Sequence, residues 1–150
     1  MSQPLDRRDP WPATDHTVDG HGLRVLDESR CFDLLGGEPI GRLGFSSGSL
    51  PVIFPVNYLL MDRTIVFCSE DGEKLRAAQQ RAVACLEIDH YDRMEHTGWS
   101  VLATGRLALS PPGRQAELAE APAAHWALSG RCRFVELPIE LIAGRIVGHD

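Results

Sequence analysis

The sequence lacks any long apolar run. None of its segments approaches the roughly 20 consecutive apolar residues that a membrane-spanning helix requires. The opening stretch, MSQPLDRRDPWP, also lacks the apolar segment of a secretory signal peptide. We therefore expect a cytoplasmic protein with no membrane partner.

Positive charge is scarce as well. The chain has 15 Lys and Arg residues against 21 Asp and Glu residues, which gives a net charge of −6 at pH 7. Proteins bind nucleic acids and anionic membranes through exposed basic surfaces. The charge balance therefore predicts that no nucleic acid is a partner.

Familiar catalytic motifs are missing. The chain has neither a G-x-S-x-G nucleophile elbow nor a G-x-x-x-x-G-K-[ST] phosphate loop. His90 and His96 stand among acidic residues in the polar stretch 90–97, but their spacing fits no metal or acid–base pattern. A solvated loop is the better interpretation of this stretch. We therefore name no catalytic residue and expect no metal site.

Cysteine pairs at metal-binding spacing are absent. The four cysteines are far apart in the sequence and form no C-x-x-C motif, which argues against a zinc ribbon. Three of them lie in segments that resemble strands. Cytosolic cysteines of this kind are usually reduced and buried as small hydrophobic side chains, which is the state we predict here. The four residues are Cys31, Cys68, Cys85 and Cys132.

What the chain does contain is typical of one folded domain. Its 43% hydrophobic and 24% charged residues are ordinary for a globular protein, and 150 residues suffice for one core. Residues 1–22 carry prolines, glycines and scattered charges without an apolar period. We predict that residues 1–22 form a flexible N-terminal arm and that residues 23–150 form the domain.

Short strands dominate the expected secondary structure. Alternating or β-branched and aromatic segments between turn residues predict strands, and apolar residues at helical spacing predict short helices. The expected strands are 40–45, 51–60, 64–68, 82–89, 98–109 and 133–137, with 139–147 as another strand or as a turn followed by a strand. The expected helices are 26–35, 73–81 and 114–121, and 123–128 could continue the last one beyond Pro122.

This order of elements favours a mainly β fold. The chain has no repeat and no regular alternation of strand and helix, which disfavours a Rossmann sheet. Six or seven mostly antiparallel strands with few helices fit a small closed β-barrel that carries its helices outside. Gly105 interrupts the strand 98–109, so we expect a bulge or a tight bend there.

The segment 50–74, LPVIFPVNYLLMDRTIVFCSEDGEK, is the centre of the chemistry we expect. Residues 61–63 form a turn that can join the strands on either side as antiparallel neighbours. Lys74 then stands at the start of a predicted helix. A lysine and the free N–H groups of a helix start attract anions, so we predict an anion site at Lys74.

The order of IGRLGF, PVIFPVNYLL, TIVFCS, GEKL, AVACLEID and GWSVLATGRL resembles that of a known family. It is similar to the FMN-binding split-barrel superfamily, that is, the pyridoxamine 5′-phosphate oxidase-like proteins. Within it, the chain resembles the small single-domain members that include nitroimidazole-resistance-type proteins. The resemblance implies a six-stranded antiparallel split barrel and a homodimer that holds FMN between its subunits.

The resemblance also implies which residues bind the cofactor. In the family, the strand that matches 51–60 lines the flavin ring, and the end of the strand that matches 64–68 lies beside the ribityl phosphate. The lysine that matches Lys74 binds that phosphate. A tryptophan and a serine on a later strand reach the flavin, often from the other subunit, and Arg145 matches a basic residue near the C-terminus. The implied cofactor-binding residues are Pro55, Val56, Asn57, Phe67, Cys68, Ser69, Lys74, Trp99 and Ser100.

Two departures from the family pattern affect the expected function. Glu73 stands where the full-length oxidases have a second basic residue beside the lysine, and the C-terminal segment that binds the vitamin substrate's phosphate is missing. We therefore do not expect vitamin B6 oxidation. The leading hypothesis is an FMN-dependent oxidoreductase of a small organic substrate. The alternatives are an F420-dependent reductase on the same fold and a flavin-binding or sensor dimer without catalysis.

Overall fold

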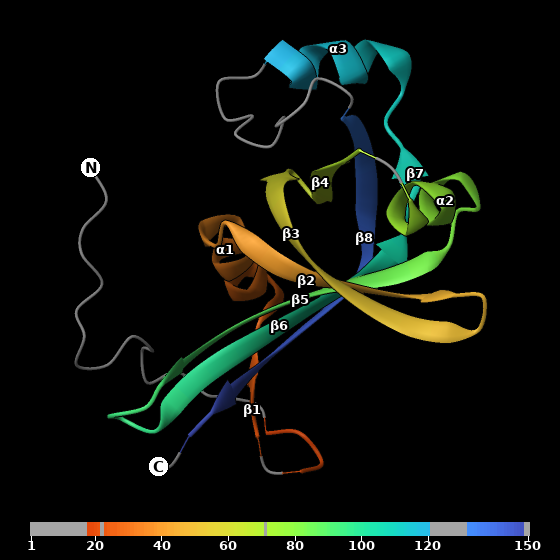
Figure 1. Cartoon of the computed structure of the whole chain (residues 1–150). Helices are drawn as coiled ribbons and strands as arrows, with labels where there is room; N and C mark the ends of the chain where they lie inside the picture. Colours follow the sequence, from red (N-terminus) through yellow and green to blue (C-terminus); the bar gives the residue numbers. More distant parts are fainter. Residues whose placement is uncertain (1–17, 22, 71, 121–131, 149–150) are drawn as a thin grey trace.

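The computed structural model describes residues 18–21, 23–70, 72–120 and 132–148 (Figure 1). Most of the predicted arm and the predicted helical continuation 123–128 lie outside these residues. The predicted arm and domain boundary therefore stay predictions. Within residues 18–21, Val18 forms a β-bridge with Arg24, and the Asp19 N–H donates to the Leu23 carbonyl at 2.9 Å.

Six long antiparallel strands form a closed ring, which confirms the predicted mainly β fold. The order around the ring is β8-β4-β3-β2-β5-β6, and β6 pairs with β8 to close it. Two short strands, β1 and β7, pair with β8. The strands are β1 (Arg24–Leu26), β2 (Ile40–Ser47), β3 (Leu50–Met61), β4 (Thr64–Ser69), β5 (Val83–Asp92), β6 (Thr97–Arg106), β7 (Ala108–Leu109) and β8 (Arg133–Val147).

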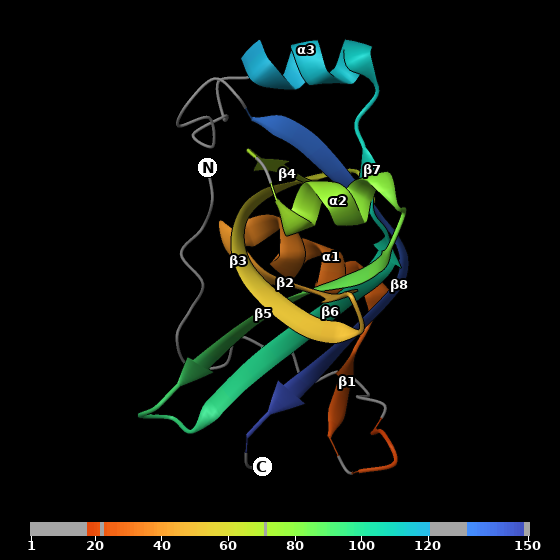
Figure 2. The same ribbon diagram turned by 45° about the vertical axis from the view of Figure 1, so that its right-hand side comes forward.

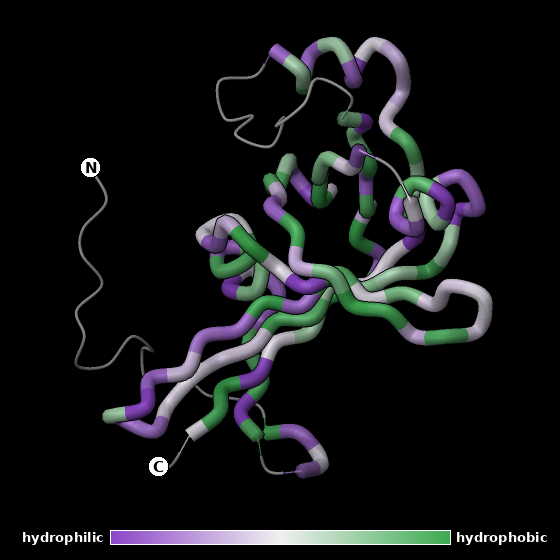
Figure 3. Tube along the Cα trace, viewed as in Figure 1, coloured by the Kyte–Doolittle hydropathy of each residue, from purple (hydrophilic) through white to green (hydrophobic). Residues whose placement is uncertain are grey.

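The core fills the ring because the strands alternate between buried and exposed side chains. Successive residues of a strand point to opposite faces, so Leu43 and Phe45 on β2 point inward with Leu86 and Ile88 on β5. Figure 3 shows hydrophobic and hydrophilic residues interspersed along the long strands. This arrangement buries one continuous hydrophobic cluster and leaves a second face of the sheet exposed.

Three helices are present among the described residues, near the predicted positions: α1 (Glu28–Gly37), α2 (Glu73–Gln79) and α3 (Pro112–Glu120). The Asp27 side chain caps α1 by accepting a hydrogen bond from the Arg30 N–H at 2.7 Å. α2 buries Leu75, Ala77 and Ala78 in the core, and Figure 2 shows it across the opening that β3 encloses. None of the helices described is long and apolar enough to cross a membrane.

The structure corrects three details of the predicted elements. The polar stretch 90–97 is half strand, because β5 continues to Asp92 and β6 begins at Thr97, and residues 93–96 form the turn of this long hairpin. Residues 133–147 form the single strand β8 although Pro138 lies within it. The short strand β1 was not predicted, because it has too few residues to show a period. The bulge expected at Gly105 is confirmed, because the β6–β8 register shifts between Thr104 and Gly105.

Candidate functional site

The barrel is split along one edge of β3. On one side, β3 pairs with β2 from Leu50 to Asn57, but on the other side it pairs with β4 only from Tyr58 onward. Among the described residues, no strand pairs with the remaining edge of β3. An unpaired strand edge presents backbone N–H and C=O groups, so this split is a place where a ligand can be bound.

The end of β4 borders the split with a buried hydroxyl group. Ser69 is 3% exposed, and its Oγ has no hydrogen-bond partner within the described part of the chain. A buried polar atom without a partner costs free energy and calls for a ligand, a water or an ion. The hydroxyl of Ser69 is therefore available to a group that enters the split.

Lys74 lies five positions after Ser69, in the first turn of α2. Its side chain is half-buried, and its Nζ lies 5.0 Å from the centre of the Phe54 ring on β3. Among the described residues, no carboxylate lies within 4.0 Å of this ammonium group, so the neighbouring Glu73 does not neutralise it. Phe54 was not predicted as a site residue. The signal that could have identified it is its place as an aromatic residue in the hairpin that leads to Lys74.

The other residues implied around the lysine divide into two groups. The side chains of Pro55 and Asn57 are exposed on the outside of β3, where a ligand can reach them. Val56 and Phe67 point into the core, at 6% and 0% exposure. Because of this orientation, neither of these two side chains can touch a ligand outside the barrel. Their contribution is to pack the walls of the split.

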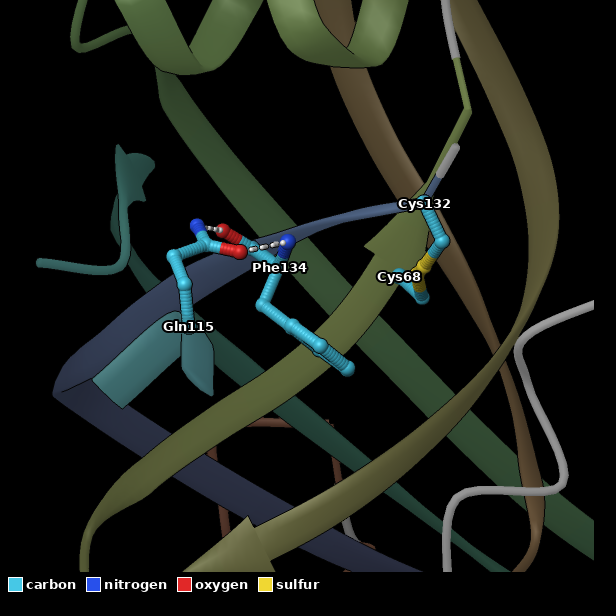
Figure 4. Close-up of a disulfide and its surroundings, with 4 residues drawn as sticks. All are labelled: Cys68, Gln115, Cys132 and Phe134. Atoms are coloured by element: carbon cyan, nitrogen blue, oxygen red, sulfur yellow. Dashed lines mark hydrogen bonds between the residues drawn. A yellow bond between two sulfur atoms is a disulfide. The ribbon is translucent and has the colours of Figure 1, made fainter. Parts of the chain in front are cut away.

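The prediction that all four cysteines are reduced is wrong for Cys68. It forms a disulfide with Cys132, and their Cα atoms are 5.6 Å apart (Figure 4). The two residues are 64 positions apart and meet because Cys132 directly precedes β8, the antiparallel neighbour of β4, which spacing in the sequence cannot reveal. Cys31 and Cys85 are free, as predicted for all four, and Cys31 is buried while Cys85 is half-buried.

Trp99 and Ser100 lie far from the lysine within one chain. The register places the row of Phe54 at Ala103 on β6, three strands away and four residues from Trp99. At about 4.8 Å per strand and 3.4 Å per residue, Trp99 lies roughly 20 Å from Phe54 across the sheet. Figure 1 shows α2 and the β5–β6 hairpin toward opposite ends of the molecule.

Arg145 belongs to the group at Trp99 rather than to the lysine. It pairs in register with Ser100, and its Nε donates to Asp19 Oδ2 at 2.8 Å. The pKa of Asp19 is held below its usual value by hydrogen bonds from the Leu23 and His21 N–H groups and by Arg145. Sequence reasoning missed Asp19, because it falls in the predicted arm.

The outer sheet face, that is, the solvent side of β2, β3, β5, β6 and β8, carries several exposed apolar side chains. Ile53 and Leu141 are 71% and 70% exposed and end one row of side chains that crosses Gly44. Ile40 and Leu102 are exposed on neighbouring rows of the same face. Exposed apolar side chains that gather on one face are typical of a surface that binds another protein.

A cluster of three charged residues lies on this outer sheet face. Arg42 Nη1 lies 3.2 Å from Glu87 Oε2 and 3.6 Å from Asp89 Oδ1. Burial raises the pKa of Glu87, and the nearby Asp89 carboxylate raises it further, while Arg42 acts in the opposite direction. A folded-state pKa above the unfolded value means that the folded protein binds this proton more tightly. The resulting stability is complete below pH 4.5 and is lost as pH rises through the raised pKa.

We therefore expect Glu87→Gln to flatten the dependence of stability on pH. The amide cannot ionise, so the variant gains melting temperature relative to the parent as pH rises from about 4.5 to 7, by the equivalent of less than about 1 kcal/mol. Thermal unfolding followed by circular dichroism at several pH values measures this difference. Parallel pH profiles for the parent and the variant would contradict the raised pKa of Glu87.

The sequence profile of the pyridoxamine 5′-phosphate oxidase family matches residues 27–146. An uncharacterized protein of Mycobacterium tuberculosis is 33% identical over 85 residues, which are 53% of this chain and 56% of that protein. The chain therefore spans little more than half the length of this curated relative.

Solved structures share the architecture. The chain is similar to the FAD-binding protein from Mycobacterium smegmatis, with 26% identity, a TM-score of 0.66 and coverage of 83% of this chain and 98% of that one. It also resembles a FAD-binding protein from Mesorhizobium loti, at 23% identity, a TM-score of 0.72 and coverage of 84% and 99%. The family profile extends from the residue that caps α1 to the last residue but one of β8 and so includes all six strands of the ring. The chain belongs to the pyridoxamine 5′-phosphate oxidase family and has its split-barrel fold.

Proposed function

We propose that this protein binds a flavin in the split beside β3 and uses it as an oxidoreductase of a small organic substrate. The observation that carries the proposal is that two groups without a partner among the described residues, the ammonium of Lys74 and the buried hydroxyl of Ser69, both lie beside the split. The similarity to the FAD-binding protein from M. smegmatis supports the same class of ligand.

The residues at the split fit the parts of a flavin. The phosphate is an anion that the ammonium of Lys74 and the hydroxyl of Ser69 can bind through charge-assisted hydrogen bonds. The exposed side chains of Pro55 and Asn57 offer an apolar edge and an amide to the ring system. When it is bound, the flavin supplies hydride transfer, and the protein supplies position and electrostatics.

FMN is the form of flavin that we propose, with FAD as the competing form. Both carry the ring and a phosphate next to the ribityl chain, so Lys74 and Ser69 serve either one. FAD brings a second phosphate and an adenosine, which need further contacts beyond the split. Lys74 and the hydroxyl of Ser69 account for one phosphate, which is what FMN carries.

We further propose that the protein works as a homodimer in which each site takes residues from both chains. Within one chain, Trp99 lies roughly 20 Å along the sheet from Phe54, which the ammonium of Lys74 contacts, so we propose that the tryptophan at each site comes from the second copy. The outer sheet face supplies the apolar surface for a second copy, since Ile53 and Leu141 would otherwise remain exposed to water. A twofold axis through one face makes that face self-complementary, as a homodimer requires.

Titration of the purified protein with FMN and FAD tests the first part of the proposal. We expect the fluorescence of FMN to be quenched as it binds with a dissociation constant in the micromolar range or below, and FAD to bind more weakly. Tighter binding of FAD would replace FMN as the ligand. Binding of neither flavin, with binding of the deazaflavin F420 instead, would overturn the flavin assignment in favour of an F420-dependent reductase.

Mixing two defective variants tests the shared site. Lys74→Ala and Trp99→Ala each weaken flavin binding when present in both chains. If the two residues serve one site from different chains, mixed dimers regain one intact site each, so that an equimolar mixture recovers about a quarter of all sites. No recovery after exchange of subunits, with mixed dimers shown by native mass spectrometry, would contradict the shared site.

A further inference from the structure

The disulfide between Cys68 and Cys132 has no part in the function proposed above. Their Cα atoms are 5.6 Å apart, within the usual range of about 4.4–6.8 Å for a disulfide. Cys68 is the residue before the end of β4, and Cys132 directly precedes β8. The bond therefore joins the end of one strand of the barrel to the beginning of its neighbour.

On one side of the bond lies the candidate flavin site. Ser69 follows Cys68 directly, and Lys74 follows six positions after it. In the β4–β8 ladder, Ser69 pairs with Arg133 as the last pair, so the ladder ends where the disulfide closes it. The bond consequently fixes the end of β4 from which the chain leads to the lysine.

On the other side lies α3, which few contacts hold in place. Gln115 Nε2 donates to the Phe134 carbonyl at 2.8 Å, and the Phe134 N–H donates back to Gln115 Oε1 at 2.8 Å (Figure 4). A small separate cluster lies beneath, formed among the described residues by buried Val66, Leu118 and Phe134, with Cys68 packed against it. Units with few buried contacts open locally at low cost, and the disulfide adds a covalent link beside this cluster through Cys68.

The two sulfur atoms are also placed for exchange with small thiols. Both cysteines are half-buried rather than fully enclosed, which lets a small thiolate approach. Cys31 shows the contrast: it is 1% exposed, and burial, with the Asp27 carboxylate adding to it, raises the pKa of its thiol. A small thiol or disulfide therefore reaches the pair and not Cys31.

We propose that Cys68 and Cys132 are a reversible dithiol–disulfide pair that controls flavin binding at the adjacent split. This inference rests on the proposed function for its ligand. The oxidant is a small-molecule disulfide such as oxidised glutathione. One S–S bond forms between the cysteines as that of the small molecule breaks, and the two protons and two electrons of the cysteine thiols leave with two small thiols. The oxidised pair holds the end of β4 in the arrangement that binds flavin, and the reduced pair releases it.

Equilibration in glutathione buffers of different redox ratio tests the pair directly. The protein has four cysteines, so we expect two free thiols after denaturation from oxidising buffer and four from reducing buffer. Reduction is expected to lower the melting temperature by about 10 °C. It is also expected to weaken FMN binding about tenfold, as follows if only about a tenth of the reduced molecules keep the binding arrangement.

Two variants and a return to oxidising buffer complete the experiment. Cys132→Ser should bind FMN as the reduced parent does, whatever the buffer, while Cys85→Ser should respond to the buffer as the parent does. Return of the parent to oxidising buffer should restore its affinity, which shows that the reduced chain had not simply unfolded for good. Four free thiols in oxidising buffer would overturn the proposed redox control of flavin binding, and so would FMN binding of equal affinity in both buffers. Either result would leave the proposed function in place. Absence of flavin binding in both buffers would overturn the two together.

Discussion

Lys74→Ala is expected to weaken flavin binding by about 10- to 100-fold. A hydrogen bond to a charged group contributes about 1.5–3 kcal/mol, and each 1.4 kcal/mol corresponds to a factor of about ten in the dissociation constant. The loss is expected to fall on the phosphate, so riboflavin, which has none, should bind the parent and the variant alike. Titrations with FMN and riboflavin at one fixed salt concentration measure both effects.

Arg76→Ala is the matched control for this prediction. Arg76 lies on the same helix, carries the same charge and is exposed. Its removal changes the net charge of the protein as the loss of the lysine does, but it removes no group at the split. If both variants weaken FMN binding equally, the effect is one of overall charge, and the phosphate assignment of Lys74 is wrong.

Gly105→Ala is expected to cost about 3 kcal/mol of folding stability and roughly 10 °C in melting temperature. A Cβ atom at this position would overlap the Pro138 carbonyl oxygen on β8. Because this oxygen belongs to the backbone, it cannot rotate away as the end of a side chain could. The ladder between β6 and β8 closes the ring here, just where its register shifts. Thermal and urea unfolding of the variant measure the loss.

Gly113→Ala provides the comparison, because it makes the same chemical change without the overlap. Gly113 lies in α3, and a Cβ there would meet no atom within 4 Å. Alanine favours a helix over glycine by up to about 1 kcal/mol, so this variant should be unchanged or slightly more stable. Equal destabilisation by both substitutions would show that the close contact at Gly105 is not what limits that position.

Much of the fold was predictable because the local signals are strong. The alternation in 40–45 and the turn at 61–63 predicted β2 and the β3–β4 hairpin, and Gly105 predicted the bulge. His90 and Tyr91 were predicted as loop because of their polar surroundings, but they lie in β5. An exposed hairpin that extends beyond the barrel needs no apolar face. A turn before Ile139 also proved unnecessary, because the β8 strand accommodates Pro138 within its length.

The site was less predictable, since its parts depend on contacts distant in the sequence. Lys74 was found from its place after the hairpin, but its position over Phe54 follows from the packing of α2 across the barrel opening. The disulfide joins cysteines 64 positions apart, which the pairing of β4 with β8 brings together. No local pattern encodes such a pairing, which is why the cysteines were predicted as reduced thiols.

The absorption spectrum of the protein as purified, followed by mass spectrometry of the small molecule released on denaturation, tests the central claim most directly. We predict a yellow protein with the two visible absorption bands of a bound flavin and release of FMN at up to one molecule per chain. A colourless protein that releases no flavin, and that takes up neither FMN nor FAD when they are added, would contradict the account.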